Sequence, residues 1–248
     1  MVRRRGCWGW ARERARGPAG RDGEWVDLAQ PMYEQMPRAL PESQVCFTPQ
    51  YIETGPPGSA VRITHLTLST HVGTHVDAAL HFLPGGRSIE QYPVDAFVGP
   101  GIVVDARREG VVPVTRAEIE AMDLDARAGD IVLFCFGYGR HFGTPAYRDH
   151  PYLGDDTADW LVERGVKLVG VDTTTPDLGG AHRPPDYAYP VHMTLLPRDI
   201  LIIEHLGPRL EELVGRRVEV NAVPLPIRSG DGAPAPVIAR AVPDEEIR

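Results

Sequence analysis

The sequence predicts a single α/β domain built around a mixed β-sheet, and three observations predict it. Short, continuous apolar runs such as residues 129–136 ("GDIVLFCF") and 166–172 ("VKLVGVD") are typical of buried strands. Helix patterns with start and stop signals lie between some of these runs. Other connections are too short for a helical crossover, so parallel and antiparallel neighbours must mix in one sheet.

The expected elements of the first half begin near residue 24. Residues 24–33 ("EWVDLAQPMY") predict a strand followed by long loops, because prolines and glycines recur up to residue 59. Residues 59–70 ("SAVRITHLTLST") alternate and are β-branched, which predicts a strand ending just before His71. Residues 84–92 predict a loop, and residues 101–106 ("GIVVDA") predict a short buried strand.

The second half alternates helices and strands. Thr115 followed by Glu118 is a capping-box pattern and predicts a helix start, and Gly165 predicts the end of a helix over residues 154–165. Residues 191–206 predict a short helical turn and then a strand ending at Glu204. A strand is expected within residues 217–227, followed by a polar, proline-rich tail.

The composition narrows the class of protein. A net charge of −8 over 248 residues argues against a nucleic-acid role and leaves a small molecule as the expected partner. The three cysteines are scattered without CxxC spacing, which favours a reducing cytoplasm. No apolar run reaches the roughly 18 residues of a membrane span. Residues 1–24 carry arginine clusters and predict a disordered basic extension, with the domain occupying residues 25–248.

One short stretch concentrates ionisable side chains. Residues 69–82 ("STHVGTHVDAALHF") place His71, His75, Asp77 and His81 at alternating positions. An extended segment would put all four on one face, and a helix would stack His71 on His75 and Asp77 on His81. Burying four such groups without an ion carries a large desolvation cost, so this cluster predicts a metal site.

The chemistry of these residues indicates a catalytic ion. His71, His75 and Asp77 supply the three ligands of a divalent-metal site that keeps one position for water. Such an ion lowers the pKa of bound water from about 16 toward about 7 and polarises a carbonyl group. His81, with an ordinary pKa near 6.5, suits the role of catalytic proton carrier.

The same stretch identifies a family resemblance. "HVGTHVDAALHF" resembles the HxGTHxDxPxHF signature of metal-dependent cyclases and kynurenine formamidase-like hydrolases, a group that includes isatin hydrolases. The resemblance extends from about residue 25 to about residue 240. It implies a mixed, partly barrel-like β-sheet flanked by helices, of the swivelling β/β/α type, and it favours a homodimer or larger homo-oligomer.

The resemblance also implies further ligands. Formamidase-like members hold a second ion through the signature aspartate, a histidine and a glutamate twelve residues apart, and His192 and Glu204 match that spacing. By similarity, Asp77, His192 and Glu204 would hold one ion, and His71, His75 and Asp77 the other. Relatives that lack the glutamate hold one ion, so Glu204 favours two. Zinc and manganese both suit these ligands. From the residues alone, a buried ion pair involving Glu204 would be equally consistent.

The sequence departs from the family pattern where the substrate would bind. Ala79 stands in place of the signature proline. Leu40 stands where formamidases carry a tryptophan, and Phe136 and Tyr138 replace part of a Thr-Gly-Trp segment. These last three residues are therefore the expected substrate-binding side chains, and they predict pocket walls unlike those of the formamidases.

Other polar residues leave alternatives open. Asp172 and Asp177 follow a buried strand and could orient ligands or substrate, or cap the loop. The loop histidines are expected to be exposed; they are His141, His150 and His182. Strand alternation predicts that His205 points away from Glu204 and lies outside the site.

The residues and the resemblance together predict a metal-dependent hydrolase that cleaves the C–N bond of an aryl formamide or a small cyclic amide. A lactone hydrolase or a secondary-metabolite cyclase would use the same site. A non-catalytic metal-binding ligand sensor is the third hypothesis, although His81 would be surplus to a purely structural site.

Overall fold

The computed structural model describes residues 23–37 and 43–243. Residues 1–22 of the predicted basic extension and the predicted substrate contact Leu40 lie outside the described residues. Within the described part of the chain, no helix combines the length and apolar character needed to cross a membrane.

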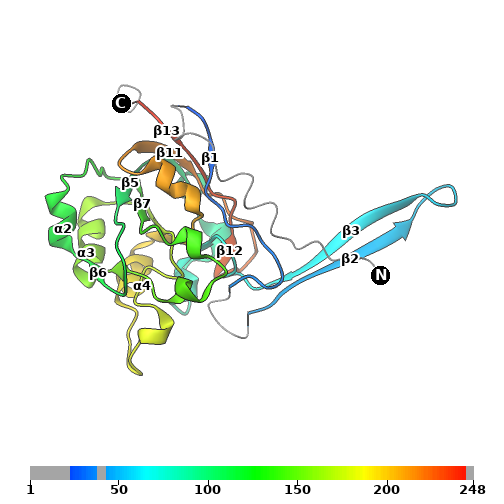
Figure 1. The fold of residues 1–248 in the computed structure, drawn as a ribbon, viewed down its shortest axis with the longest axis horizontal. Helices are drawn as coiled ribbons and strands as arrows, with labels where there is room; N and C mark the ends of the chain where they lie inside the picture. The colour runs from blue at the N-terminus through cyan, green and yellow to red at the C-terminus, as the bar shows by residue number, and fades with distance from the viewer. Residues whose placement is uncertain (1–22, 38–42, 244–248) are drawn as a thin grey trace.

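The core of the fold is a nine-stranded mixed sheet that curls into a half-barrel (Figure 1). Its four central strands run parallel, and its flanking strands run antiparallel. In spatial order the strands are β1 (Val26–Asp27), β13 (Ile238–Ala241), β11 (Arg217–Asn221), β5 (Val98–Asp105), β7 (Ile131–Cys135), β9 (Leu168–Val171), β10 (Leu201–Glu204), β4 (His75–Asp77) and β12 (Gly232–Pro234). The predicted mixed-sheet α/β domain is therefore confirmed.

Alternation along the central strands divides the apolar residues into two cores. In β7, Ile131 and Leu133 enter one core together with residues of β11 and β13. Val132 and Phe134 enter the other, which the helices cover. The sheet is thus buried on both faces, as the continuous apolar runs in its central strands predicted. The helices are α2 (Arg116–Ala121), α3 (Asp155–Arg164) and α4 (Pro190–Leu195).

The predicted helix signals act as expected. Thr115 accepts a hydrogen bond from the Glu118 backbone amide, and the Glu118 carboxylate accepts one from the Thr115 amide at 2.8 Å. Gly165 ends α3 in the left-handed conformation, with a φ of 70°. Short 3₁₀ helices occupy many connections, and β6 (Pro113–Val114) forms a small parallel pair with β8 (Tyr152–Leu153). The 3₁₀ helices are η1 (Ala79–His81), η2 (Ile89–Gln91), η3 (Val94–Ala96), η4 (Gly139–His141), η5 (Pro145–Arg148), η6 (Gly180–His182), η7 (Leu196–Arg198) and η8 (Pro208–Leu213).

The prediction of loops throughout residues 34–58 is wrong. Strand β2 (Val45–Glu53) pairs with β3 (Ala60–Leu68) over nine residues each, and the hairpin projects from the body as an arm (Figure 1). The equally exposed partner β3 was predicted from its β-branched residues, whereas β2 has fewer of them and is flanked by prolines and glycines. Pro49 within the strand also argued against pairing.

The prediction of a polar tail after residue 227 is also wrong. Strand β12 pairs with β4, and β13 pairs with both β11 and β1. Small residues and prolines form β12, and they lack the β-branched pattern typical of strands. Pro234 is tolerated because β12 is an edge strand of the nine-stranded sheet.

A buried ion pair ties β11 to the start of β7. The Arg217 guanidinium donates from Nη2 to Asp130 Oδ1 at 2.9 Å, and both side chains are buried. Replacing Asp130 by Ala leaves a buried cation without its partner, so the free energy of unfolding should fall by about 3–5 kcal/mol. Urea denaturation of the Asp130→Ala variant measures this. Arg116→Ala, which removes exposed ion pairs on α2, should leave the midpoint almost unchanged, and equal effects of the two variants would contradict the prediction.

Candidate metal centre

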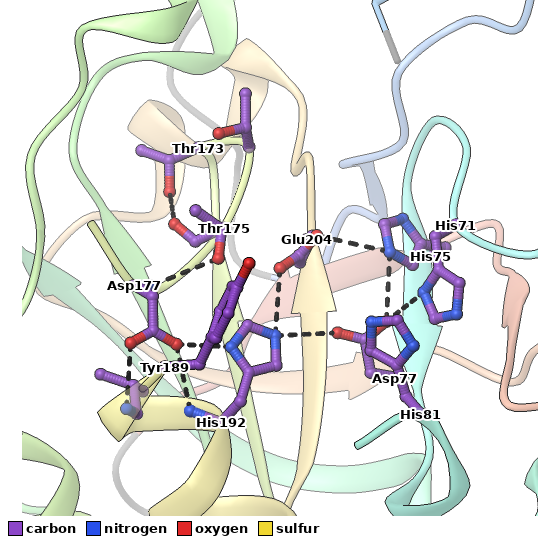
Figure 2. A network of polar contacts seen from close by, with 12 residues as sticks. His71, His75, Asp77, His81, Thr173, Thr175, Asp177, Tyr189, His192 and Glu204 are labelled. Atoms are coloured by element: carbon purple, nitrogen blue, oxygen red, sulfur yellow. Dashed lines mark hydrogen bonds and ion pairs between the residues drawn. The ribbon is translucent and has the colours of Figure 1, made fainter. Parts of the chain in front are cut away.

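The histidine-rich segment adopts neither of the two regular conformations considered from its sequence. It forms a turn at residues 71–74, the three-residue strand β4, and the 3₁₀ helix η1. Within β4, His75 and Asp77 point to the same face of the sheet. The turn before the strand and the helical turn after it bring His71 and His81 to the same centre (Figure 2).

Two residues fix the turn in front of β4. Gly73 has a φ of +59°, and a Cβ atom there would lie 2.9 Å from the Met36 side chain, so glycine is required both for conformation and for space. The Thr74 hydroxyl donates to the His205 carbonyl at 2.6 Å and accepts from the Gln30 amide at 2.8 Å. The turn is therefore anchored to segments distant in the sequence.

The neighbouring strand and a helix complete the centre. In the antiparallel pair of β10 with β4, Glu204 lies directly opposite His75. Helix α4 supplies His192 from the helix-covered side. Asp77 reaches both imidazoles, with Oδ1 3.2 Å from His75 Nε2 and Oδ2 3.5 Å from His192 Nε2. Glu204 also reaches both imidazoles, with Oε2 3.5 Å from His75 Nε2 and Oε1 3.5 Å from His192 Nε2. Two carboxylates thus lie between two imidazoles.

Three groups of described residues bring donor atoms within 4.8 Å of one another. The group of Asp77, His192 and Glu204 is the set that the resemblance implies for one ion. His71 groups with Asp77 and His81, whereas His75 groups with Glu204 and His205. His71 and His75 both approach Asp77 Oδ1, at 2.7 and 3.2 Å, but they do not share a group.

The donor set fits a divalent ion. His75 and Asp77 are fully buried, yet His75 Nε2 and Asp77 Oδ2 make no hydrogen bond within the described residues. A buried polar atom left without a partner costs about 1–3 kcal/mol, and an ion between these atoms would remove that cost. Imidazole nitrogens and carboxylate oxygens are typical ligands of zinc and manganese.

Outer hydrogen bonds orient the imidazoles. His75 Nδ1 donates to the Gly73 carbonyl at 2.8 Å, and His192 Nδ1 donates to Asp177 Oδ2. Asp177 also accepts from the backbone amides of Val191 and His192, each at 3.1 Å. Both rings therefore turn Nε2 toward the centre. Of the two roles considered for Asp177, it has that of orienting a candidate ligand.

Asp172 has the other role, that of a loop cap. Its carboxylate accepts hydrogen bonds from four consecutive backbone amides at 2.8–3.3 Å. These amides belong to residues 136–139, the segment that follows β7. Burial raises the pKa of Asp172 to about 6, against the lowering effect of these amides. Asp172 therefore caps the loop that follows β7.

The charges of the site favour protonated imidazoles in the absence of an ion. His71 lies between Asp77 Oδ1 at 2.7 Å and Asp231 Oδ2 at 2.9 Å. Burial opposes its protonation, but the two carboxylates outweigh burial and raise its pKa to about 10. For His192, burial is likewise outweighed by the neighbouring carboxylates, Asp177 foremost, and the pKa lies well above the usual value. Burial would raise the pKa of Asp77, but the neighbouring imidazoles, His71 foremost, hold it well below its usual range.

Two residues beside the cluster were not predicted from the sequence. Asp231 contacts His71 and His81 but lies in the segment interpreted as a tail. His205 is buried next to His75 and Glu204, so the prediction that it points away from the site is wrong. Strand alternation stops at Glu204, because His205 has a left-handed φ of 60°. Its Nδ1 is bonded to the Tyr147 hydroxyl at 2.9 Å.

The three loop histidines differ in their exposure to solvent. His182 is exposed as predicted and bonds to Asp149 at 2.8 Å, and His141 is partly exposed. The expectation of exposure is wrong for His150, which is fully buried. Its ring bonds to the Pro151 carbonyl at 2.7 Å and to the Thr174 hydroxyl. Both ring nitrogens of the buried His150 thus have hydrogen-bond partners, a backbone carbonyl and a hydroxyl.

Two aromatic residues, Phe82 and Tyr189, lie against His192. Phe82 stacks on His192 with ring centroids 4.5 Å apart. Tyr189 lies edge-on to the same imidazole, with ring centroids 6.3 Å apart (Figure 2). Tyr189 has a left-handed backbone conformation directly before Pro190, which no sequence signal predicted. Phe136 is buried in the helix-covered core, and the Tyr138 hydroxyl accepts from the Gly110 amide. The expected contribution of Phe136 and Tyr138 to substrate binding stays a prediction.

Comparisons with known proteins identify the family. The family model described as "Putative cyclase" matches residues 26–178. The kynurenine formamidase of Salinibacter ruber is 36% identical over 187 residues, which cover 75% of this chain and 83% of that protein. The kynurenine formamidase of Bacillus cereus is 26% identical over 219 residues, covering 88% of this chain and 98% of that protein.

Solved structures show the same fold. Isatin hydrolase A from Ralstonia solanacearum matches with a TM-score of 0.72 and 28% identity, over 87% of this chain and 91% of that one. Isatin hydrolase A from Labrenzia aggregata, bound to benzyl benzoate, matches with a TM-score of 0.76 and 26% identity, over 89% and 94% of the two chains. Because the family model spans more than half of the sequence and carries the histidine signature with it, the chain belongs to the cyclase family.

Proposed function

We propose that this protein is a metal-dependent hydrolase that cleaves the C–N bond of an aryl formamide or a small cyclic amide. The observation that carries the proposal is the placement of Asp77 and Glu204 between His75 and His192, with buried donor atoms that lack a hydrogen-bond partner. The similarity to kynurenine formamidases and isatin hydrolases supports the reaction class.

The residues of the site have separate proposed roles. A divalent ion, when bound, supplies water activation and carbonyl polarisation. His71, His75, Asp77, His192 and Glu204 are the residues proposed to hold it. His81 is partly exposed and has Nδ1 3.5 Å from Asp231, so its Nε2 is available to accept a proton and return it to the leaving nitrogen. The rings of Phe82 and Tyr189, 5.2 Å apart, offer an apolar edge for an aryl substrate.

A substrate panel tests this proposal. Purified, metal-loaded protein is assayed with N-formylkynurenine, isatin and simple lactones, and chelator-treated protein is the control. The proposal predicts metal-dependent turnover of at least one of the two amide substrates. Turnover of lactones alone would replace it with a lactone hydrolase, and no turnover of any substrate would favour a non-catalytic metal-binding role.

The pKa values predict how metal binding depends on pH. His71, with a pKa of about 10, and His192, whose pKa is well above the usual value, both carry a proton near neutral pH when no metal is bound. A ligating imidazole must be neutral, so binding should release about two protons and the affinity should rise with pH. Calorimetry in buffers of different ionisation enthalpy measures the number. The His71→Ala variant should release about one proton fewer, and proton-independent binding would contradict the assignment.

Three finer expectations stay proposals. We propose zinc or manganese as the ion, with two ions per chain, because Asp77 and Glu204 each face both His75 and His192.

The scattered cysteines are the basis for proposing a cytoplasmic location. The homo-oligomer implied by the family resemblance has a candidate contact in the β2–β3 arm, where Tyr51 and Leu66 are exposed. Light scattering of the full chain gives the oligomeric state.

A further inference from the structure

Asp231 lies on a segment that is hydrogen-bonded to the residues that follow β4. The Ala78 amide donates to the Asp231 carbonyl at 2.9 Å, and the Ile89 amide donates to the Gly230 carbonyl at 2.9 Å. Gly232 pairs with Asp77 across β12 and β4, and a Cβ atom on it would lie 2.7 Å from His71 Cε1. The absence of a side chain at Gly232 therefore lets this backbone approach the His71 ring closely.

The carboxylate of Asp231 faces two imidazoles with one oxygen. Its Oδ2 lies 2.9 Å from His71 Nε2 and 3.5 Å from His81 Nδ1. Its other oxygen, Oδ1, accepts from the Thr70 hydroxyl at 2.8 Å. The two rings stack, with centroids 3.8 Å apart and planes 25° apart. Asp231 thus connects a candidate metal ligand to the candidate proton carrier.

We propose that Asp231 is a positioning residue that holds His71 and His81 as one stacked pair. It accepts from His71 Nε2, so that Nδ1 faces Asp77, and it anchors His81 through Nδ1, so that Nε2 is left for the substrate. Asp177 has the equivalent relation to His192 on the other side of the centre. The role of His81 in this proposal rests on the proposed hydrolase function.

A double-mutant cycle tests whether Asp231 acts through His81. We compare kcat and KM at saturating metal for wild type, Asp231→Ala, His81→Ala and the double variant. Asp231→Ala should lower kcat by about 10–100-fold with little change in KM. In the His81→Ala background the same change should have little further effect, because residues that act as a unit are non-additive. Additive losses would overturn the proposal.

Two further variants separate positioning from loop support. Asp231→Asn keeps one acceptor oxygen and should recover part of the kcat that Asp231→Ala loses. Thr70→Val removes the contact from Thr70 to Asp231 but leaves both imidazoles facing the carboxylate, so kcat should change little. A loss with Thr70→Val as large as with Asp231→Ala would show that Asp231 only supports the loop, and would refute the positioning role.

A metal titration tests the His71 half of the proposal without any turnover. Chelator competition with zinc should show an affinity about 10–100-fold weaker for Asp231→Ala than for wild type, and a comparable loss for Asp177→Asn. If wild type hydrolyses no substrate of the panel, the proposed function fails while this titration still decides the question. Wild-type zinc affinity in a folded Asp231→Ala variant would overturn the role assigned at His71.

Discussion

Replacing Asp77 by Asn is expected to remove bound metal and hydrolytic activity together. Among the residues that the structure describes, Asp77 is the one carboxylate that approaches His71, His75 and His192, with nearest contacts of 2.7–3.5 Å. The Asn side chain keeps the shape but removes the negative charge on which each candidate ion depends. Elemental analysis should show loss of metal, and turnover should fall to that of chelator-treated wild type.

The control for this variant is another aspartate. Asp95 is exposed in η3, away from the cluster, and Asp95→Asn should keep both metal and activity. Because Asp77 is fully buried, the folded state of the variant is checked by thermal unfolding after chelation of both proteins. An Asp77→Asn variant that keeps wild-type metal content would refute the assignment of Asp77 as the shared ligand.

Replacing His81 by Ala should separate metal binding from turnover. His81 is partly exposed and stacks on His71, and it lies outside the ligand set proposed for either ion. Loss of a positioned proton carrier lowers kcat by about 10²–10⁴-fold. Steady-state kinetics and elemental analysis on the same preparation measure both quantities.

A matched histidine variant distinguishes this effect from a general loss of imidazole. His182 is exposed in a loop and bonded to Asp149, so His182→Ala should retain full kcat. Activity of His81→Ala equal to wild type would exclude His81 as the proton carrier. Loss of metal from the same variant would instead place His81 among the ligands, as its grouping with His71 and Asp77 allows.

The fold was predictable where burial shaped the sequence. The central strands are buried on both faces and appear as continuous apolar runs, and α2 and α3 carry cap residues that satisfy backbone groups locally. Strand β2 was not predicted because Pro49 lies within it and prolines and glycines flank it, although its equally exposed partner β3 was predicted from its β-branched residues. Strands β12 and β13 consist largely of small residues or short alternations, and their pairing depends on distant partners.

The site was predictable to the extent that its residues are close in sequence. His71, His75, Asp77 and His81 lie within eleven positions and converge as expected. Glu204 reaches them because β4 pairs antiparallel with β10, and His192 reaches them from helix α4. Local sequence spacing contains neither of these arrangements. Only the family resemblance indicated these two residues before the fold was known.

Tertiary contacts alone reveal the remaining residues. Asp231 joins the cluster through the pairing of β12 with β4, and His205 joins it through a left-handed residue at the end of β10. Neither has a local sequence signal. Glu204 itself occupies the carboxyl end of a parallel strand, the position at which α/β sheets commonly place their sites.

Elemental analysis of freshly purified, active protein tests the central claim most directly. A bound divalent ion organised by His75, Asp77, His192 and Glu204 predicts one or two equivalents of zinc or manganese per chain, with activity lost on chelation and restored by the same metal. Full activity in protein that contains no such ion would contradict the account.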